Sequence, residues 1–467
     1  MKKTNILFIL IDDLGWRDIG CAGSNFYQTP HIDRLSAEGM RFTDAYASCP
    51  VCSPTRASVM TGQYPATVGI TDWIDWGGRL HPLRGRVVDV PYLKQLQPTA
   101  HSLPRVLKEA GYQTWHVGKW HLGGEGSSPE NHGFEVNIGG CHAGSPGAGG
   151  YFSPWSIPVL QDVDVPPGTY LTDYLTDCAV KLIQERDEDR PFFLNLWHYA
   201  VHIPIQAKPE KVAYYEAKAR ALGLDRQETF RDGEFFPCEH NRTERICRRL
   251  IQSDPTYAAM IENLDENLGR VLQAIDDAGE SENTLIIFTS DNGGLATSEG
   301  SPTCNAPLAE GKGWMYEGGV RVPLIVKWPD RIRPGSICRE SVTTPDFYPT
   351  LLEVAGSATL PGYELDGVSL TPLLTQTGDL GREAIFWHYP HYGNQGGTPG
   401  SSVRMGDYKL IEFFEDGRLE LYDLKTDPGE IRNLAVDQPL RAEEMRDRLF
   451  AWRQQVEAQI PQPNPKT

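Results

Sequence analysis

Short apolar runs recur along the chain, and longer segments with helical periodicity separate them. Strands are predicted at residues 5–11, 112–117, 191–197, 284–289 and 322–328. Helices are predicted at residues 29–39, 102–110, 170–185, 254–278 and 344–355. The strand segments are apolar almost throughout, which is typical of strands buried on both faces of a mostly parallel sheet. The sequence therefore predicts an α/β fold in which helices cover both sides of the sheet.

The pattern changes near residue 360, where shorter segments with turns between them begin. Strands are predicted at 386–389, 402–405, 408–414 and 419–424, followed by a helix at 441–460. We expect a smaller antiparallel sheet with one helix, and we divide the chain into domains at 1–360 and 361–467. The charged segment 206–251 is predicted to be an irregular surface insertion.

Polar residues follow directly after the predicted strands, at the edge of the sheet where such folds bind ligands. Asp12 and Asp13 end the first strand, and Asp291 and Asn292 follow the strand at 284–289. Oxygen ligands of this kind suit Ca²⁺ or Mg²⁺. A turn is the alternative for the Asp-Asn-Gly-Gly stretch. Two such pairs, each at a strand end, favour a metal site.

The stretch from Cys49 to Gly62 places a nucleophile at the start of a short helix. Pro54 suits the first helical turn and Gly62 suits the end of the helix. Cys52 then lies at a helix N-terminus, where an anion is stabilised. Two alternatives are a buried structural cysteine and a redox or zinc pair with Cys49, although a zinc site would need a second such pair.

Cations and histidines follow the other strands. Lys119 and His121 point to the same side of an extended segment. A tetrahedral anion needs several positive charges and a titratable group, and the chain offers them at Arg56, Lys119, Lys312 and His121. His202 is predicted to be an acid for a leaving group, with His198 as its rival.

Composition narrows the classes of partner. The 467 residues carry 44 Lys and Arg against 62 Asp and Glu, a net charge of −18, which argues against nucleic acid or anionic membrane as partners. The nine cysteines are scattered and do not resemble a disulfide framework. No transmembrane run is present, and the apolar run 6–11 is too short for a signal peptide. We expect a cytoplasmic protein as written, or a periplasmic or secreted one if a leader has been removed.

Cys-Ser-Pro-Thr-Arg at 52–56 fits the Cys-x-Pro-x-Arg signature of the type I, formylglycine-dependent sulfatases. With the motifs above, the chain resembles this family from residue 5 to about residue 329, which implies an alkaline-phosphatase-like fold. The resemblance implies that a maturation enzyme oxidises Cys52 to formylglycine. It also implies that a Ca²⁺, or a Mg²⁺, is bound by Asp12, Asp13, Asp291 and Asn292.

The resemblance further implies a role for each charged position. The hydrated aldehyde would attack sulfur, with Asp291 as the partner for its proton. Charge on the transferring group would be neutralised by Arg56, Lys119 and Lys312. His202 would protonate the departing alcohol, and His121 would assist elimination of sulfate. The family's additional serine contact has no clear match, and Ser145 in the glycine-rich stretch 139–150 is the candidate for it.

Overall the chain looks most like arylsulfatase A-type and bacterial carbohydrate sulfatases, which implies sulfated galactose or N-acetylgalactosamine as substrate. Aromatic and histidine side chains predicted to line a sugar cleft, or alternatively to pack in the core, are Trp73, Trp76, His388 and His391. One alternative function is a phosphonate or phosphodiester hydrolase of the same fold. Another is a non-catalytic binding module in which Cys52 is never oxidised. The sequence does not predict an oligomeric state.

Overall fold

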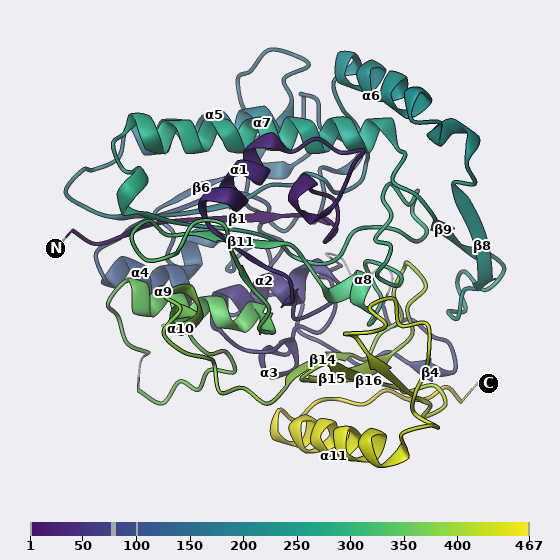
Figure 1. The fold of residues 1–467 in the computed structure, drawn as a ribbon. Coiled ribbons are helices and arrows are strands. Elements are labelled where there is room, and N and C mark those ends of the chain that lie inside the picture. The colour runs from purple at the N-terminus through teal and green to yellow at the C-terminus, as the bar shows by residue number, and fades with distance from the viewer. Residues whose placement is uncertain (1, 76–80, 100, 360, 466–467) are drawn as a thin grey trace.

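The computed structural model describes residues 2–75, 81–99, 101–359 and 361–465, and an eight-stranded sheet forms its centre (Figure 1). The strand order is β12-β2-β11-β10-β1-β7-β5-β6. Its strands are β1 (Asn5–Ile11), β2 (Met40–Phe42), β5 (Gln113–Gly118), β6 (Val136–Ile138), β7 (Phe192–Trp197), β10 (Thr284–Ser290), β11 (Leu324–Lys327) and β12 (Ser336–Cys338). All pairs are parallel except those that β11 makes with β10 and β2. The predicted mostly parallel sheet is confirmed.

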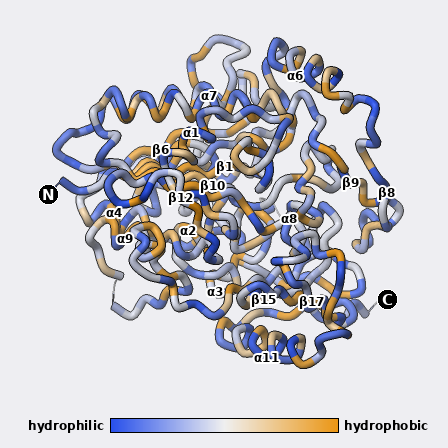
Figure 2. Tube along the Cα trace, viewed as in Figure 1, coloured by the Kyte–Doolittle hydropathy of each residue, from blue (hydrophilic) through white to orange (hydrophobic). Residues whose placement is uncertain are grey.

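Helices cover both faces of this sheet, and strand β1 shows why. Its side chains alternate between two cores, because successive residues of a strand point to opposite faces. Leu7 and Ile9 pack with α1 (Pro30–Glu38), α5 (Leu171–Gln184) and α7 (Pro255–Asp277). Phe8 and Leu10 pack on the other side with α2 (Cys52–Thr61), α4 (Leu103–Glu109) and α9 (Phe347–Val354). Apolar residues accordingly concentrate on the central strands (Figure 2).

A second sheet, antiparallel throughout, lies at the C-terminal end as predicted. It consists of β14 (Ile385–Tyr389), β15 (Gly400–Met405), β16 (Tyr408–Phe413) and β17 (Leu419–Asp423), and α11 (Pro439–Gln455) covers its outer face (Figure 1). Leu410 points toward α11, whereas its neighbour Ile411 points toward Tyr46 and Val51 near the start of α2. Residue 360, where we place the domain boundary, lies outside the described residues, so the division into 1–360 and 361–467 stays a prediction.

Some sequence predictions need correction. Segment 206–251 is not irregular, because it contains α6 (Pro209–Ala221) and a hairpin of β8 (Phe230–Phe235) and β9 (Arg245–Arg249). Most of the β8 side chains are exposed on both faces, so the alternation that identifies a strand is missing. The last helix ends at Gln455, five residues before its predicted end.

Several short elements complete the fold. Two further pairs of strands are β3 (Ala45–Tyr46) with β13 (Val342–Thr343), and β4 (Val87–Val88) with β18 (Gln462–Pro463). The short helices are α3 (Pro65–Val68), α8 (Glu317–Val320) and α10 (Thr371–Leu374). In the part of the chain that the structure describes, no helix combines the length and apolar character needed to cross a membrane.

Candidate active site

The carboxyl ends of the central strands and the start of helix α2 meet at one place. Asp12 and Asp13 follow β1, Lys119 follows β5, and Asp291 follows β10. Cys52 is the first residue of α2, which ends at Gly62 in the left-handed conformation (φ 71°). All five side chains are buried. The fold therefore gathers into one site residues that are far apart in sequence.

Each carboxylate of the site lies against a cation from another element. The Nζ of Lys119 lies 2.6 Å from Oδ2 of Asp12. The Nζ of Lys312 lies 2.8 Å from Asp13. The Nη2 and Nε atoms of Arg56 lie 2.7 and 3.0 Å from Oδ2 of Asp291. Arg56 therefore contacts the predicted metal ligands directly, and it donates a further hydrogen bond to the carbonyl of Lys119.

The pKa values of two adjacent carboxyl groups are shifted in opposite directions. Burial raises the pKa of Asp12 well above its ordinary value, and the nearby Asp291 and Asp13 raise it further against the effect of Lys119. Burial also acts to raise the pKa of Asp13, but Lys312 and then His202 outweigh it, so this pKa is lowered. A further cation at this place would favour the ionised form of Asp12.

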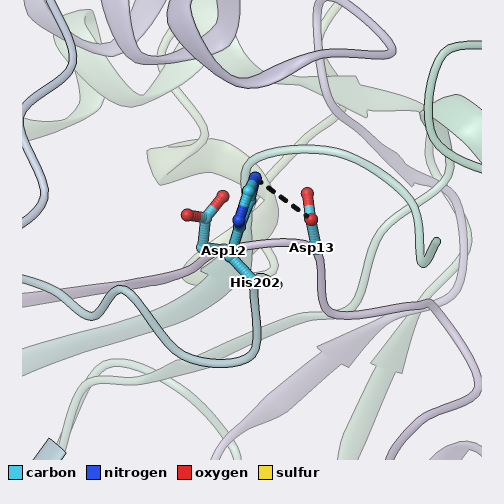
Figure 3. Close-up of side chains that lie close together, drawn as sticks. All are labelled: Asp12, Asp13 and His202. Atoms are coloured by element: carbon cyan, nitrogen blue, oxygen red, sulfur yellow. Dashed lines mark ion pairs between the residues drawn. The ribbon is translucent and has the colours of Figure 1, made fainter. Parts of the chain in front are cut away.

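Two buried oxygens at the site are left without a hydrogen-bond partner among the described residues: Oδ1 of Asp12 and Oδ1 of Asn292. The Nδ2 of Asn292 donates to Asp13 over 2.8 Å, which turns its oxygen away from that contact. Ligand atoms of Asp12, Cys52 and Asp291 lie within 4.8 Å of one another, as do those of Asp12, Asp13 and His202 (Figure 3). Carboxylate and amide oxygens without partners fit a hard divalent cation.

Cys52 faces His121. Its Sγ lies 3.3 Å from Nδ1 of His121, whose Nε2 lies 3.0 Å from the carbonyl oxygen of Ile74. A carbonyl only accepts, so Nε2 carries the proton and Nδ1 is free to accept one from residue 52. Burial, and then Lys119, lower the pKa of His121 well below its ordinary value, and burial raises the pKa of the Cys52 thiol.

The backbone around His121 is closely packed. His121 has a φ of 56°, in the left-handed region. A Cβ atom at position 144 would lie 2.5 Å from Cε1 of His121, so only a glycine fits there. The glycine-rich stretch at 139–150 thus forms a wall of the site. Within it, Ser145 lines the cavity next to Cys52, and its predicted contact with the substrate stays a prediction.

His202 is placed with one ring nitrogen free for chemistry. Its Nδ1 lies 2.7 Å from the carbonyl of Ile203, so Nδ1 carries a proton, and its Nε2 lies 3.7 Å from Asp13 (Figure 3). Burial, and then Lys312, lower the pKa of His202 to about 3. The rival residue His198 is also buried, and burial lowers its pKa to about 4, but it does not line the cavity beside Cys52.

A cavity of about 270 Å³ opens above Cys52. Residues that line it and that the sequence analysis proposed are Cys52, Trp73, His121, Ser145, His202 and Lys312. Arg56 and Lys119 are fully buried beneath it. Lining residues that the sequence analysis missed include His142, Glu299, Asn394 and Gln395. His142 lies in the glycine-rich stretch 139–150 that the sequence analysis singled out, whereas Glu299, Asn394 and Gln395 belong to no motif named there.

The two histidines proposed to bind substrate lie elsewhere in the structure. His388 is buried, with Nδ1 2.7 Å from Oγ of Ser401 and Nε2 2.9 Å from the carbonyl of Gln459. His391 is also buried and pairs with Thr71 over 2.8 Å. Neither lines the cavity beside Cys52, and both make contacts typical of packed core residues. Trp76 lies outside the described residues. Substrate binding by these side chains stays a prediction.

All nine cysteines lie within the described residues, and none forms a disulfide. Cys49 is buried three residues before Cys52, and burial raises its pKa well above the ordinary value. The structure thus shows no disulfide for the redox alternative. No second cysteine pair completes a zinc site with Cys49 and Cys52 among the described residues.

Comparison with known proteins identifies the family. The family model Sulfatase matches residues 4–357, and the model N-sulphoglucosamine sulphohydrolase, C-terminal, matches residues 310–455. A sulfatase of Formosa agariphila is 34% identical, over 97% of this chain and 89% of the relative. Arylsulfatase A of Homo sapiens is 33% identical, over 93% and 83% respectively.

A solved structure gives the same result. The crystal structure of Ps i-CgsB in complex with k-i-k-neocarrahexaose has a TM-score of 0.74 and 26% identity, and the match covers 97% of this chain and 93% of that one. These matches favour sulfate ester hydrolysis over the phosphonate or phosphodiester alternative, and an enzyme over a binding module. The chain belongs to the sulfatase family and is a sulfuric ester hydrolase with an alkaline-phosphatase-like fold.

Proposed function

We propose that this sulfatase removes sulfate from a carbohydrate, such as galactose or N-acetylgalactosamine units, with Cys52 converted to formylglycine by a maturation enzyme. The observation that carries the proposal is the position of Cys52. It lies at the start of α2, 3.3 Å from His121, in a cavity that Lys312 and His202 also line. The complex of Ps i-CgsB with k-i-k-neocarrahexaose supports a carbohydrate substrate.

The proposed metal is Ca²⁺, with Mg²⁺ as the alternative. The residues that would hold it are Asp12, Asp13, Asp291 and Asn292, and the unpartnered oxygens of Asp12 and Asn292 support this set. A divalent cation supplies charge that offsets the crowded carboxylates and stabilises negative charge on a bound sulfate. Lys119 and Arg56 hold Asp12 and Asp291 in place through short ion pairs.

The protein's own side chains provide the proton transfers and the charge. Formylglycine supplies a hydrated aldehyde, whose second hydroxyl lets sulfate leave without attack by external water. His121 accepts a proton from residue 52 at Nδ1, because its Nε2–H is held by Ile74. Lys312 lines the cavity and offsets charge on the sulfate. His202 would act as the acid for the departing alcohol through Nε2: its Nδ1–H is held by Ile203, so Nε2 is the nitrogen that takes up a proton and then donates it.

The decisive test is the mass of the peptide that contains Cys52, taken from protein made together with a maturation enzyme. We expect a peptide lighter by the change from thiol to aldehyde and reactive toward a hydrazide. The same preparation should release sulfate from a sulfated galactose or N-acetylgalactosamine saccharide. An unmodified thiol, under conditions that convert a control sulfatase, contradicts the proposed mechanism. Modified protein that releases no sulfate from any saccharide contradicts the proposed substrate class.

A further inference from the structure

A second cavity, of about 720 Å³, lies directly beside the catalytic cavity. Glu299 and Asn394 line both cavities, so the two spaces adjoin each other. The catalytic cavity, at about 270 Å³, is smaller than the roughly 300–1,000 Å³ typical of pockets that enclose a drug-sized ligand. It has room for a small sulfated group, whereas the larger neighbouring cavity, called the groove below, has room for further units.

The β8–β9 hairpin forms the outer wall of this groove, and its backbone is joined to the loop that carries two proposed metal ligands. The N–H of Arg249 donates to the carbonyl of Ala296 over 3.0 Å, and the N–H of Ser298 donates to the carbonyl of Cys247 over 2.8 Å. Ser298 lies in the same loop as Asp291, a few residues after β10. The groove is therefore positioned relative to the catalytic centre by main-chain hydrogen bonds.

The chemistry of the groove fits sugar rings. Its wall presents aromatic, amide and charged side chains: Phe230, His240, Asn241, Glu244, Arg245 and Asn394. Phe230 is 43% exposed, and the guanidinium of Arg249 lies over its ring, 4.5 Å from the ring centroid. Glu244 and Glu299 outnumber Arg245 among the lining residues, so the groove has no excess of positive charge to bind a further anionic group. Amides and an aromatic face suit hydroxyl groups and the apolar faces of sugars.

We propose that this groove binds the sugar units that flank the sulfated residue, so that the preferred substrate is a sulfated oligosaccharide or polysaccharide and not a sulfated monosaccharide. The inference rests on the proposed function, since it assumes a sulfated carbohydrate in the catalytic cavity. Phe230 is assigned as a stacking surface for a flanking sugar. Asn394, at the junction of the two cavities, is assigned to hydrogen-bond the chain where it leaves the catalytic cavity.

The test compares substrates of increasing length with the matured enzyme. We expect kcat/KM for one sulfated glycan to rise about tenfold from monosaccharide to tetrasaccharide. Phe230→Ala should remove most of this gain by raising KM, and should leave the hydrolysis of an aryl sulfate unchanged, because an aryl sulfate is too short to reach the groove. Phe450→Ala is the matched control, since Phe450 is an exposed phenylalanine on α11. It should change neither substrate's kinetics.

The outcomes separate the two proposals. If the enzyme cleaves an aryl sulfate but shows no gain with saccharide length, the groove proposal is wrong and the proposed chemistry stands. Equal losses of activity toward the aryl sulfate and the tetrasaccharide in Phe230→Ala also contradict the groove proposal, since they indicate damage to the fold. Two measurements check for such damage: the melting temperature of Phe230→Ala, and the activity of Phe230→Leu, which keeps the apolar bulk. If no sulfate ester is cleaved by protein with the confirmed aldehyde, the proposed function itself fails.

Discussion

Two groups of buried charges in this enzyme use the same residue types for different purposes. The first is the active site at the carboxyl ends of the central strands. The second, the Lys409 cluster, consists of Tyr46, Glu317, Lys409 and Glu430 and lies where strand β16 of the C-terminal sheet meets β3 and α8. Lys409 lies 3.0 Å from both Glu317 and Glu430 and is fully buried. Its charges come from segments as distant in sequence as those of the active site.

The two groups differ in how closely their buried oxygens are paired with cations and hydrogen-bond donors. In the Lys409 cluster each of the four glutamate oxygens faces a cation or a donor. The Oε1 atoms of Glu317 and Glu430 both face Lys409. Oε2 of Glu317 accepts a hydrogen bond from Tyr46, and Oε2 of Glu430 accepts one from the N–H of Glu317. In the active site, Oδ1 of Asp12 has only the more distant Nη2 of Arg56, at 3.6 Å, and Oδ1 of Asn292 has no hydrogen-bond partner among the described residues. A buried cluster in which every carboxyl oxygen has a close cation or donor holds a fold together, whereas one with loosely paired oxygens is ready for a ligand.

The largest effect expected from breaking the active-site group is that of Cys52→Ala. Turnover should fall by more than about 10⁴-fold, because the nucleophile is removed, while the melting temperature stays near that of the parent. Steady-state assays and calorimetry measure the two quantities. Cys49→Ala, three residues earlier in the same buried loop, is the matched control and should keep its activity. Residual turnover in Cys52→Ala close to that of the control would rule out Cys52 as the nucleophile.

Removal of the metal tests the unpaired oxygens. Treatment with a chelator should lower activity by more than about 100-fold, and added Ca²⁺ should restore it. Added Ca²⁺ should also raise the unfolding free energy, by about 2.7 kcal/mol at a concentration 100 times the dissociation constant. Elemental analysis and thermal melts measure these changes. Full activity in protein shown by elemental analysis to hold no divalent metal would overturn the proposed site at Asp12 and Asn292.

Lys409→Met breaks the second group. It leaves Glu430 buried without its cation and Glu317 with only Arg321, and should cost about 3–5 kcal/mol of unfolding free energy. The specific activity of the folded fraction should not change, because Lys409 does not line the catalytic cavity. Denaturant titration and active-site titration separate these effects. Lys425→Met is the control, since Lys425 is an exposed lysine of the same C-terminal region. A loss of kcat per folded molecule would mean that the two groups are coupled.

The smallest effect concerns His388, a buried neutral group in the C-terminal sheet. Burial lowers its pKa to about 3, below the unfolded value of about 6.5. Below pH 6.5 the unfolded chain therefore binds a proton that the native state excludes, so this residue makes stability fall as pH falls. His388→Gln should reduce that loss by about 2 kcal/mol between pH 7 and pH 5. Urea titrations at both pH values measure it. A raised KM for a sulfated glycan in this variant would instead support the substrate-binding prediction.

More of the candidate active-site residues than of the residues around them could be predicted from the sequence. Asp12, Asp13, Asp291 and Asn292 were predictable because they directly follow buried strands, and strand ends meet at one edge of a parallel sheet. The C-terminal sheet was predictable from its short alternating segments and turns.

Three features of the structure could not be predicted, because no pattern in the sequence indicates them. The wall residues Glu299 and Asn394 come from loops whose paths depend on tertiary packing. The carbonyl of Ile74 sets the tautomer of His121, and any residue has a carbonyl. The β8–β9 hairpin exposes most of its side chains, so it lacks the periodicity that identifies strands. His388 resembles a site residue in sequence, and only its buried contacts with Ser401 and Gln459 reveal a different environment.

The attachment of the β8–β9 hairpin also bears on how such an enzyme can diversify. The hairpin meets the loop after β10 through main-chain hydrogen bonds between Arg249 and Ala296 and between Cys247 and Ser298. These bonds do not depend on which side chains the hairpin carries. Mutations at its groove-facing positions can therefore accumulate without moving Asp291, and laboratory evolution for a new glycan can randomise this hairpin while the reaction chemistry is inherited intact.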